Sequence, residues 1–145
     1  MAIYQIANFL LHCNDWLEID RERIDQFAAC TDDYQCIHVD EARAAKSPFG
    51  RTIAHGFLLL SLVNFFRCKG NFIPETTKMS VNYGLNRVWF LAPVAVGSRI
   101  RDRAVLSGVE RRSKGRVLVT VTHTLEIENE EKPACVADVL SLFYV

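Results

Sequence analysis

An acid and a histidine that could act as general acid and base, Asp33 and His38, stand five residues apart. A carboxylate and an imidazole can accept a proton from a reacting group and donate one to it when they are held beside that group. An unperturbed histidine titrates near ~6.5, so it can carry protons in both directions at neutral pH. An isolated Asp-x4-His pair is also typical of a surface acid beside a capping histidine. The residues around the pair therefore decide its significance.

A helix and an ordered loop are expected around this pair. Asp20 can cap a helix over 21–30, because apolar residues recur on one of its faces. The next segment, 31–50, mixes acids, a histidine and Ser-Pro-x-Gly turn residues. We expect most of it to be an ordered loop with one short helical turn after Asp40.

An apolar helix and several strands are expected in the rest of the chain. From Gly56 to Cys68 nearly every position is apolar, which predicts a helix buried on most sides. The later segments are separated by turn residues and predict strands over 82–90, 100–109, 116–128 and 134–145. Such an order predicts an α+β hot-dog fold, in which an antiparallel sheet wraps around a central apolar helix. A generic α+β domain is the structural alternative.

The segment from Phe27 to Asn64 resembles the hydratase motif of MaoC-like proteins. In that family Asp-x-Asn-Pro-x-His is followed by a short helix and then by His-Gly at the start of the central helix. The separation of 23 residues between Asp33 and Gly56 fits this arrangement. Residues 82–106 resemble a later part of the same fold, so the resemblance spans most of the chain. The Gln-x-Ile-His-Val-Asp and Ser-Pro-Phe-Gly-x-Thr-Ile-Ala-His-Gly sequences are most similar to the NodN-type subgroup.

The resemblance implies a hydro-lyase that adds water to trans-2-enoyl thioesters and forms (R)-3-hydroxyacyl thioesters. Asp33 is then favoured as the base and His38 as the proton donor. Gly56 is the candidate oxyanion donor, because its backbone N–H at a helix start can approach a carbonyl and the helix dipole favours negative charge there. The substrate is expected to be an acyl-CoA or an acyl-carrier thioester. Coenzyme A is then part of the substrate, and no separate cofactor is implied.

Two further residues are candidates for a supporting role, and both lie where this chain departs from the family pattern. Gln35 and Cys36 replace the Asn-Pro of the hydratases, and the Gln35 amide can still form hydrogen bonds. Asn64 stands where the hydratases often have a serine that bonds the acid, so its amide either orients Asp33 or is only a polar residue on the helix. Trp89 stands where an arginine is frequent.

The remaining histidines favour structural roles, and no metal site is expected. His55 is more typical of a helix cap or loop anchor than of a catalyst. His123 lies beside valines on a predicted strand, which is typical of a core or interface histidine. The five cysteines form no CxxC pair that would suggest zinc.

The composition favours one globular domain over 1–145. Seventeen lysines and arginines balance seventeen acids, so no net field draws the chain to nucleic acid or to an anionic membrane. The scattered cysteines and the absence of a basic leader at the start suggest a cytoplasmic protein. A sheet wrapped on one helix exposes an edge and an apolar rim, so a homodimer or a dimer-based oligomer is expected.

Two other functions fit the same fold. Hot-dog proteins include thioesterases, which also bind acyl thioesters and need an acid near a helix N-terminus. The order of Asp-x4-His and then His-Gly favours the hydratases over these. The other alternative is a non-catalytic module that binds acyl thioesters or stabilises a partner subunit, and the altered Gln35-Cys36 pair keeps it open.

Overall fold

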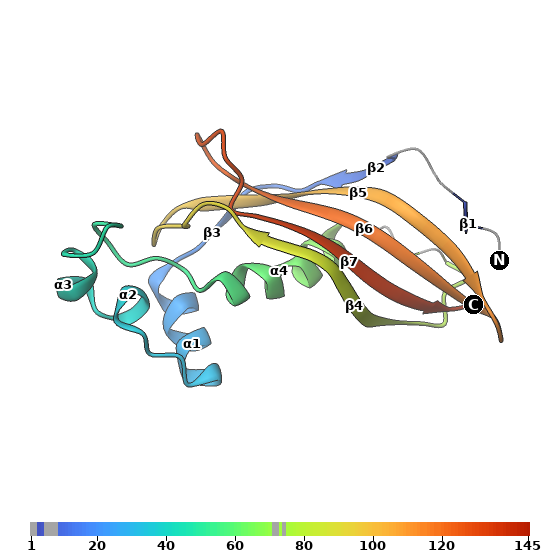
Figure 1. Ribbon diagram of the computed structural model, residues 1–145, viewed down its shortest axis with the longest axis horizontal. Coiled ribbons are helices and arrows are strands. Elements are labelled where there is room, and N and C mark those ends of the chain that lie inside the picture. Colours follow the sequence, from blue (N-terminus) through green and yellow to red (C-terminus); the bar gives the residue numbers. More distant parts are fainter. Residues whose placement is uncertain (1–2, 5–8, 71–72, 74) are drawn as a thin grey trace.

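The computed structural model describes residues 3–4, 9–70, 73 and 75–145, and its main feature is a curved antiparallel sheet around helix α4 (Gly56–Lys69), as Figure 1 shows. The strands run in the order β1-β5-β6-β7-β4, and β2 and β3 also pair with β5. The strands are β1 (Ile3–Tyr4), β2 (Phe9–Cys13), β3 (Leu17–Glu18), β4 (Met79–Phe90), β5 (Arg99–Arg112), β6 (Arg116–Ile127) and β7 (Cys135–Tyr144). This arrangement confirms the predicted hot-dog fold.

The four long strands agree with the segments predicted from the sequence, whereas the three short N-terminal strands were not predicted. β4 to β7 are long enough for their turns and apolar positions to identify them. β2 and β3 are short, and each pairs with β5. Such long-range pairing leaves no local pattern in the sequence.

Helix α4 forms the centre of the hydrophobic core. Its buried side chains pack against the inner face of the sheet, where Ile100 and Leu125 are fully buried. The buried positions of the helix are Leu58, Leu59, Leu62, Val63 and Phe66. The helix was predicted to be buried on most sides, but Phe57 is 70% exposed, so one face is uncovered in the single chain. No helix within the described ranges is long and apolar enough to cross a membrane.

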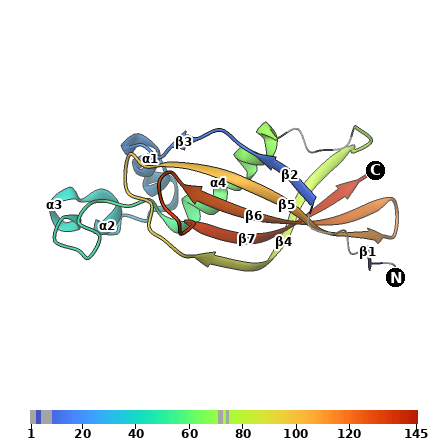
Figure 2. The same cartoon turned by 90° about the horizontal axis from the view of Figure 1, so that it is seen from above.

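Three shorter helices lie together at one end of the sheet, next to the start of α4 (Figures 1 and 2). Helix α1 (Arg21–Thr31) begins where the sequence predicts, because the Asp20 side chain accepts a hydrogen bond from the Arg23 amide. Helix α3 (Glu41–Ala44) is the predicted turn after Asp40. Helix α2 (Cys36–Val39) falls where a loop was expected, and this corrects the prediction for that segment.

A buried acid on β5 joins two histidines on neighbouring strands. The carboxylate of Asp102 is fully buried and lies 2.7 Å from Nδ1 of His123 on β6. It also lies 3.2 Å from Nε2 of His12 on β2. His123 is therefore a hydrogen-bonded core histidine, as the strand pattern predicts, and it lies away from the predicted dyad.

Candidate active site

The fold brings Asp33, His38 and His55 together at the start of α4. One possible ligand atom from each residue lies within 4.8 Å of the others. Asp33 follows the residue that ends α1 in a left-handed conformation, His38 belongs to α2, and His55 directly precedes α4. Asp33 and His38 are thus close in space, with His38 on the short helix α2 and Asp33 in the turn that precedes it.

The His38 ring is buried, and its hydrogen bond sets the position of its proton. Nδ1 lies 2.8 Å from the carbonyl oxygen of Ile53. A carbonyl only accepts, so Nδ1 carries the proton and Nε2 of the neutral ring is free to accept one. Desolvation is the main influence and lowers the pKa of His38, and the bond to Ile53 partly offsets it. Of the nearby groups, His55 and Arg21 lower this pKa further and Asp33 raises it.

The Asp33 side chain is exposed, and one hydrogen bond reaches its carboxylate while another reaches its backbone carbonyl. Its Oδ1 atom accepts a hydrogen bond from the backbone N–H of Gln35, with an N···O distance of 3.3 Å. Its carbonyl oxygen accepts one from Nε2 of His55 at 3.0 Å. The carboxylate can therefore meet water or substrate while the main chain behind it is held in place.

Arg21 holds the α2 segment from behind, a contact that sequence reasoning missed. Its guanidinium donates to the carbonyl oxygen of His38 at 2.8 and 2.9 Å and to Oγ1 of Thr52 at 3.1 Å. An arginine in the first turn of a surface helix is ordinary, so no local signal points to this role. The contact ties α1 to the loop that leads into α4.

Gly56 and His38 line the same hollow, which has a volume of about 250 Å³. Leu59, Phe90 and Val94 also line it. The His55 side chain does not cap α4, and among the described residues no other side chain bonds the N–H groups of its first turn. A positive helix end without a cap can bind a carbonyl oxygen that gains negative charge. The hollow thus combines a proton-transfer group with a candidate oxyanion donor.

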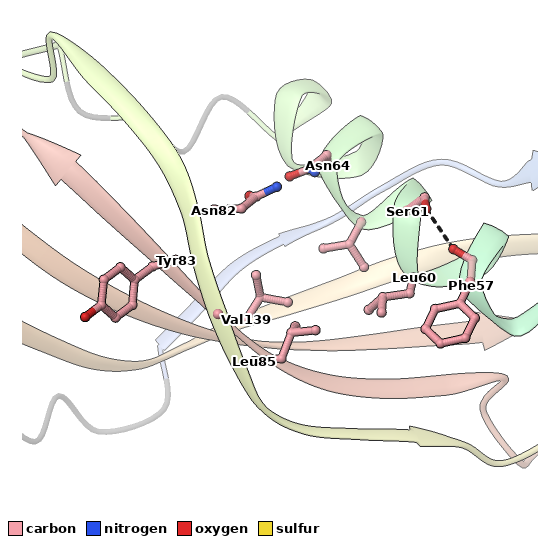
Figure 3. Close-up of a pocket in the computed structure, with 10 residues that line it drawn as sticks. Phe57, Leu60, Ser61, Asn64, Asn82, Tyr83, Leu85 and Val139 are labelled. Carbon is pink, nitrogen blue, oxygen red and sulfur yellow. Dashed lines mark hydrogen bonds between the residues drawn. The ribbon is translucent and has the colours of Figure 1, made fainter. Parts of the chain in front are cut away.

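The two supporting candidates lie in different places. Gln35 contacts Asp33 through its backbone amide and is the residue before α2, but no hydrogen bond of its side chain amide is found among the described residues. Asn64 lies two turns along α4, in a groove between α4 and β4 (Figure 3). No hydrogen bond joins Asn64 to Asp33 within the described part of the chain, so an orienting role for Asn64 stays a prediction.

The groove between α4 and β4 has a volume of about 400 Å³ and a mixed lining. Leu60, Leu85 and Val139 form apolar walls, and Asn64 and Asn82 stand on facing sides of the groove (Figure 3). Phe57 lines this groove, Phe90 lines the hollow with His38, and the two rings contact each other edge to face at 5.9 Å. The groove and the hollow therefore meet at this ring pair.

Possible metal-ligand atoms of Asp33, His38 and His55 lie close together, but the two histidine rings are stacked on each other. The two imidazole rings are stacked with their centroids 3.8 Å apart and their planes 26° apart. The in-plane lone pairs of such rings lie nearly side by side, whereas zinc needs ligands that converge in a tetrahedron.

Comparisons with known proteins agree with this geometry. Residues 11–128 match the family model described as the MaoC like domain. The 3-hydroxyacyl-thioester dehydratase Z of Mycobacterium tuberculosis is 48% identical over 130 residues, covering 86% of this chain and 82% of that protein. Nodulation protein N of Rhizobium leguminosarum is 45% identical over 130 residues, covering 89% of this chain and 81% of that protein.

A solved structure of a related protein is also similar to this chain. The (R)-hydratase from A. caviae involved in PHA biosynthesis has 25% sequence identity and a TM-score of 0.70, covering 90% of this chain and 92% of that one. One conclusion follows from the sequence similarity, the antiparallel sheet around α4 and the dyad at the start of that helix. The chain belongs to the MaoC-like domain family.

Proposed function

We propose that the chain is a hydro-lyase that adds water to trans-2-enoyl thioesters and gives (R)-3-hydroxyacyl thioesters. The observation that carries this proposal is the position of His38 at the start of α4, where it lies close to Asp33 and lines a hollow with Gly56. Hydration needs a group that takes a proton from water, a group that gives one to C2 and a donor for the thioester oxygen. These residues offer all three.

His38 and Asp33 hold the attacking water between them. In the neutral ring only Nε2 can take a proton, because Nδ1 is committed to Ile53. His38 therefore removes a proton from the water as its oxygen bonds C3, and it then delivers that proton to C2. The Asp33 carboxylate accepts the second hydrogen bond of the water and orients it. Sequence reasoning favoured Asp33 as the base, and the two assignments predict opposite pH dependences.

The Gly56 amide stabilises the charge that develops on the thioester oxygen. It lines the hollow with His38, and within the described part of the chain no side chain competes for the N–H groups at that helix end. A donor of this kind contributes most when it is already in place before the reaction begins. The negative charge on the enolate-like oxygen is also favoured by the dipole of α4, which is 14 residues long.

The groove between α4 and β4 is the proposed place of the acyl chain. Its apolar walls, Leu60, Leu85 and Val139, suit hydrocarbon, and it joins the hollow at the contact between Phe57 and Phe90. The thioester carrier is coenzyme A or an acyl carrier, and it enters as part of the substrate. The proposed reaction uses no separate cofactor, and a cytoplasmic location stays a prediction.

A homodimer or a dimer-based oligomer is part of the proposal. β4 pairs with β7 on one side, and its other edge ends the sheet. Large apolar side chains are exposed along this strand, namely Met79, Val81, Tyr83, Leu85, Trp89 and Phe90. An exposed apolar edge strand favours pairing with another chain. A second copy placed at this edge would also cover the groove between α4 and β4.

The test is the loss of the ultraviolet absorbance of the enoyl group when the purified protein meets crotonyl-CoA. Asp33→Asn and His38→Gln should each lower the hydration rate by at least ~100-fold and leave binding of a product analogue within about tenfold. The double variant should be little worse than either single variant, because two groups that act on one water fail together.

Two results would contradict the proposal. Parental rates in both single variants would leave a binding or subunit-stabilising module as the function. Release of free coenzyme A from an acyl-CoA, without hydration of an enoyl-CoA, would identify a thioesterase.

A further inference from the structure

His55 occupies the position that caps α4, yet its side chain does not cap the helix. Its backbone is extended, with φ −63° and ψ 137°, and the side chain makes no hydrogen bond to the amides of the first turn. The residue is nevertheless 2% exposed, which is unusual for a polar side chain without a structural reason. Of the two roles that the sequence suggested, a helix cap is therefore wrong.

The His55 ring instead contacts both members of the dyad. Its Nε2 atom donates to the carbonyl oxygen of Asp33 at 3.0 Å. Its face stacks on the ring of His38, with the centroids 3.8 Å apart. Phe27 of α1 adds a further ring contact at 5.0 Å, which helps to confine the imidazole. The Nδ1 atom of His55 is buried and has no partner among the described residues, so the ring makes its one hydrogen bond to Asp33.

These contacts join two residues that the local backbone does not hold together. The exposed Asp33 lies just before α2, and His38 lies within α2. A shift of either side chain by about 1 Å would spoil the alignment with a shared water, and such misplacement can lower a rate by ~100-fold. Neither Asp33 nor His55 lines the hollow that holds His38 and Gly56, but the Asp33 carboxylate is exposed to water whereas the His55 ring is buried. His55 therefore has less access to water or substrate than either member of the dyad.

We infer that His55 is a positioning residue of the proposed hydratase, which aligns Asp33 and His38 on one water through a hydrogen bond to the Asp33 backbone and a ring stack on His38. The inference rests on the proposed function for its effect on rate. The contacts themselves can be tested without any substrate. The two contacts can also be removed separately, because different side chains preserve one or the other.

Three substitutions separate the hydrogen bond from the stack. His55→Gln keeps an N–H donor at a similar reach and removes the ring. His55→Phe keeps the ring and removes the donor, and His55→Leu removes both. His12→Gln is the control, because it alters a partly buried histidine that bonds Asp102 outside the site. Circular dichroism and the melting temperature give the folded fraction, and each kcat is expressed per folded molecule.

The Leu variant should lose at least ~100-fold in kcat for crotonyl-CoA, with KM within about threefold of the parent. The kcat of the Gln variant and that of the Phe variant should each be at least about fivefold higher than the kcat of the Leu variant, because each keeps one contact. The proton resonances of the His38 ring should keep the shift caused by stacking in the Phe variant and lose it in the Gln and Leu variants. The control should keep the parental kcat.

Two results would overturn the inference. One is a folded Leu variant with the parental kcat. The other is a loss of kcat in the Leu variant while the His38 ring resonances stay unchanged, which would mean that His55 does not hold that ring. If the parent protein does not hydrate crotonyl-CoA at all, the proposed function fails, and the resonances alone then decide whether His55 holds His38.

Discussion

The ring of Phe90 lies so close to Gly56 that a Cβ atom at position 56 would be only 3.1 Å from it. Phe90 belongs to the edge strand β4 and Gly56 to the start of α4, so the two residues close one side of the hollow with His38. Any side chain at position 56 would push this ring and narrow the approach to the backbone N–H.

We therefore expect Gly56→Val to lower kcat for hydration by at least ~100-fold, the lower range for loss of one oxyanion donor. The fold should survive, because Phe90 is 46% exposed and has room to move. Gly108→Val on β5 is the matched control, since the nearest atoms to its added Cβ would lie at an ordinary 3.5 Å. A folded Gly56→Val variant with parental turnover would mean that Gly56 is only a packing residue.

The lowered pKa of His38 predicts the pH dependence of the reaction. If the neutral ring takes the proton from water, kcat/KM is level near pH 7 and falls as the pH drops through the His38 pKa. Burial lowers this pKa, so the midpoint of the fall should lie below the ordinary value of 6.5. The pH profile of kcat/KM measures this midpoint. The residual activity of the His38→Gln variant is the reference, because its profile should lack the fall at low pH. A rate that rises as the pH falls through the same range would instead identify His38 as the initial donor.

A charge placed on the β4 edge should separate the proposed dimer. Tyr83 is exposed on this strand, so Tyr83→Glu should leave the single chain folded and bring repelling charges together between two copies. Sedimentation at micromolar concentration should show mostly monomer. Phe9→Glu on β2, at the opposite side of the sheet, should stay dimeric. A parent protein that is already a stable monomer would contradict the dimer.

The buried carboxylate of Asp102 should be important for stability and not for chemistry. Asp102→Leu removes the shared acceptor of His12 and His123, and buried groups left without a partner should lower the free energy of unfolding by about 3 kcal/mol. Glu128→Gln, which alters an ion pair at the surface, should change it by about 0.5 kcal/mol or less. Urea unfolding measures both. A loss below about 1 kcal/mol for Asp102→Leu would mean that the histidines find other partners.

The elements with long regular patterns could be predicted from the sequence. Helix α4 and strands β4 to β7 each extend over ten or more residues, so their apolar positions and turns identify them. The N-cap at Asp20 gave the start of α1 because the carboxylate bonds a nearby amide, which is a local interaction. Local chemistry was enough for these parts of the fold.

The parts of the structure that could not be predicted from the sequence depend on contacts between distant residues. The four residues of α2 carry no periodic pattern, and Arg21 holds their end from another helix. The spacing of Asp33, His38 and Gly56 pointed to the site, but it could not reveal that the His55 ring stacks on His38. A sequence gives the order of such residues, whereas the stack exists only once α2 and the start of α4 are packed together.

The short stretch of chain that carries Asp33, α2 and His38 has a consequence for how this fold can evolve. Acid and histidine are inherited together, so each copy of the gene encodes a complete pair. After a duplication, mutations in one copy can destroy its pair while the other copy keeps its own. In the proposed dimer, a damaged copy that still folds would cover the β4 edge of its partner, so an inactive paralogue could persist as a structural subunit beside an active one.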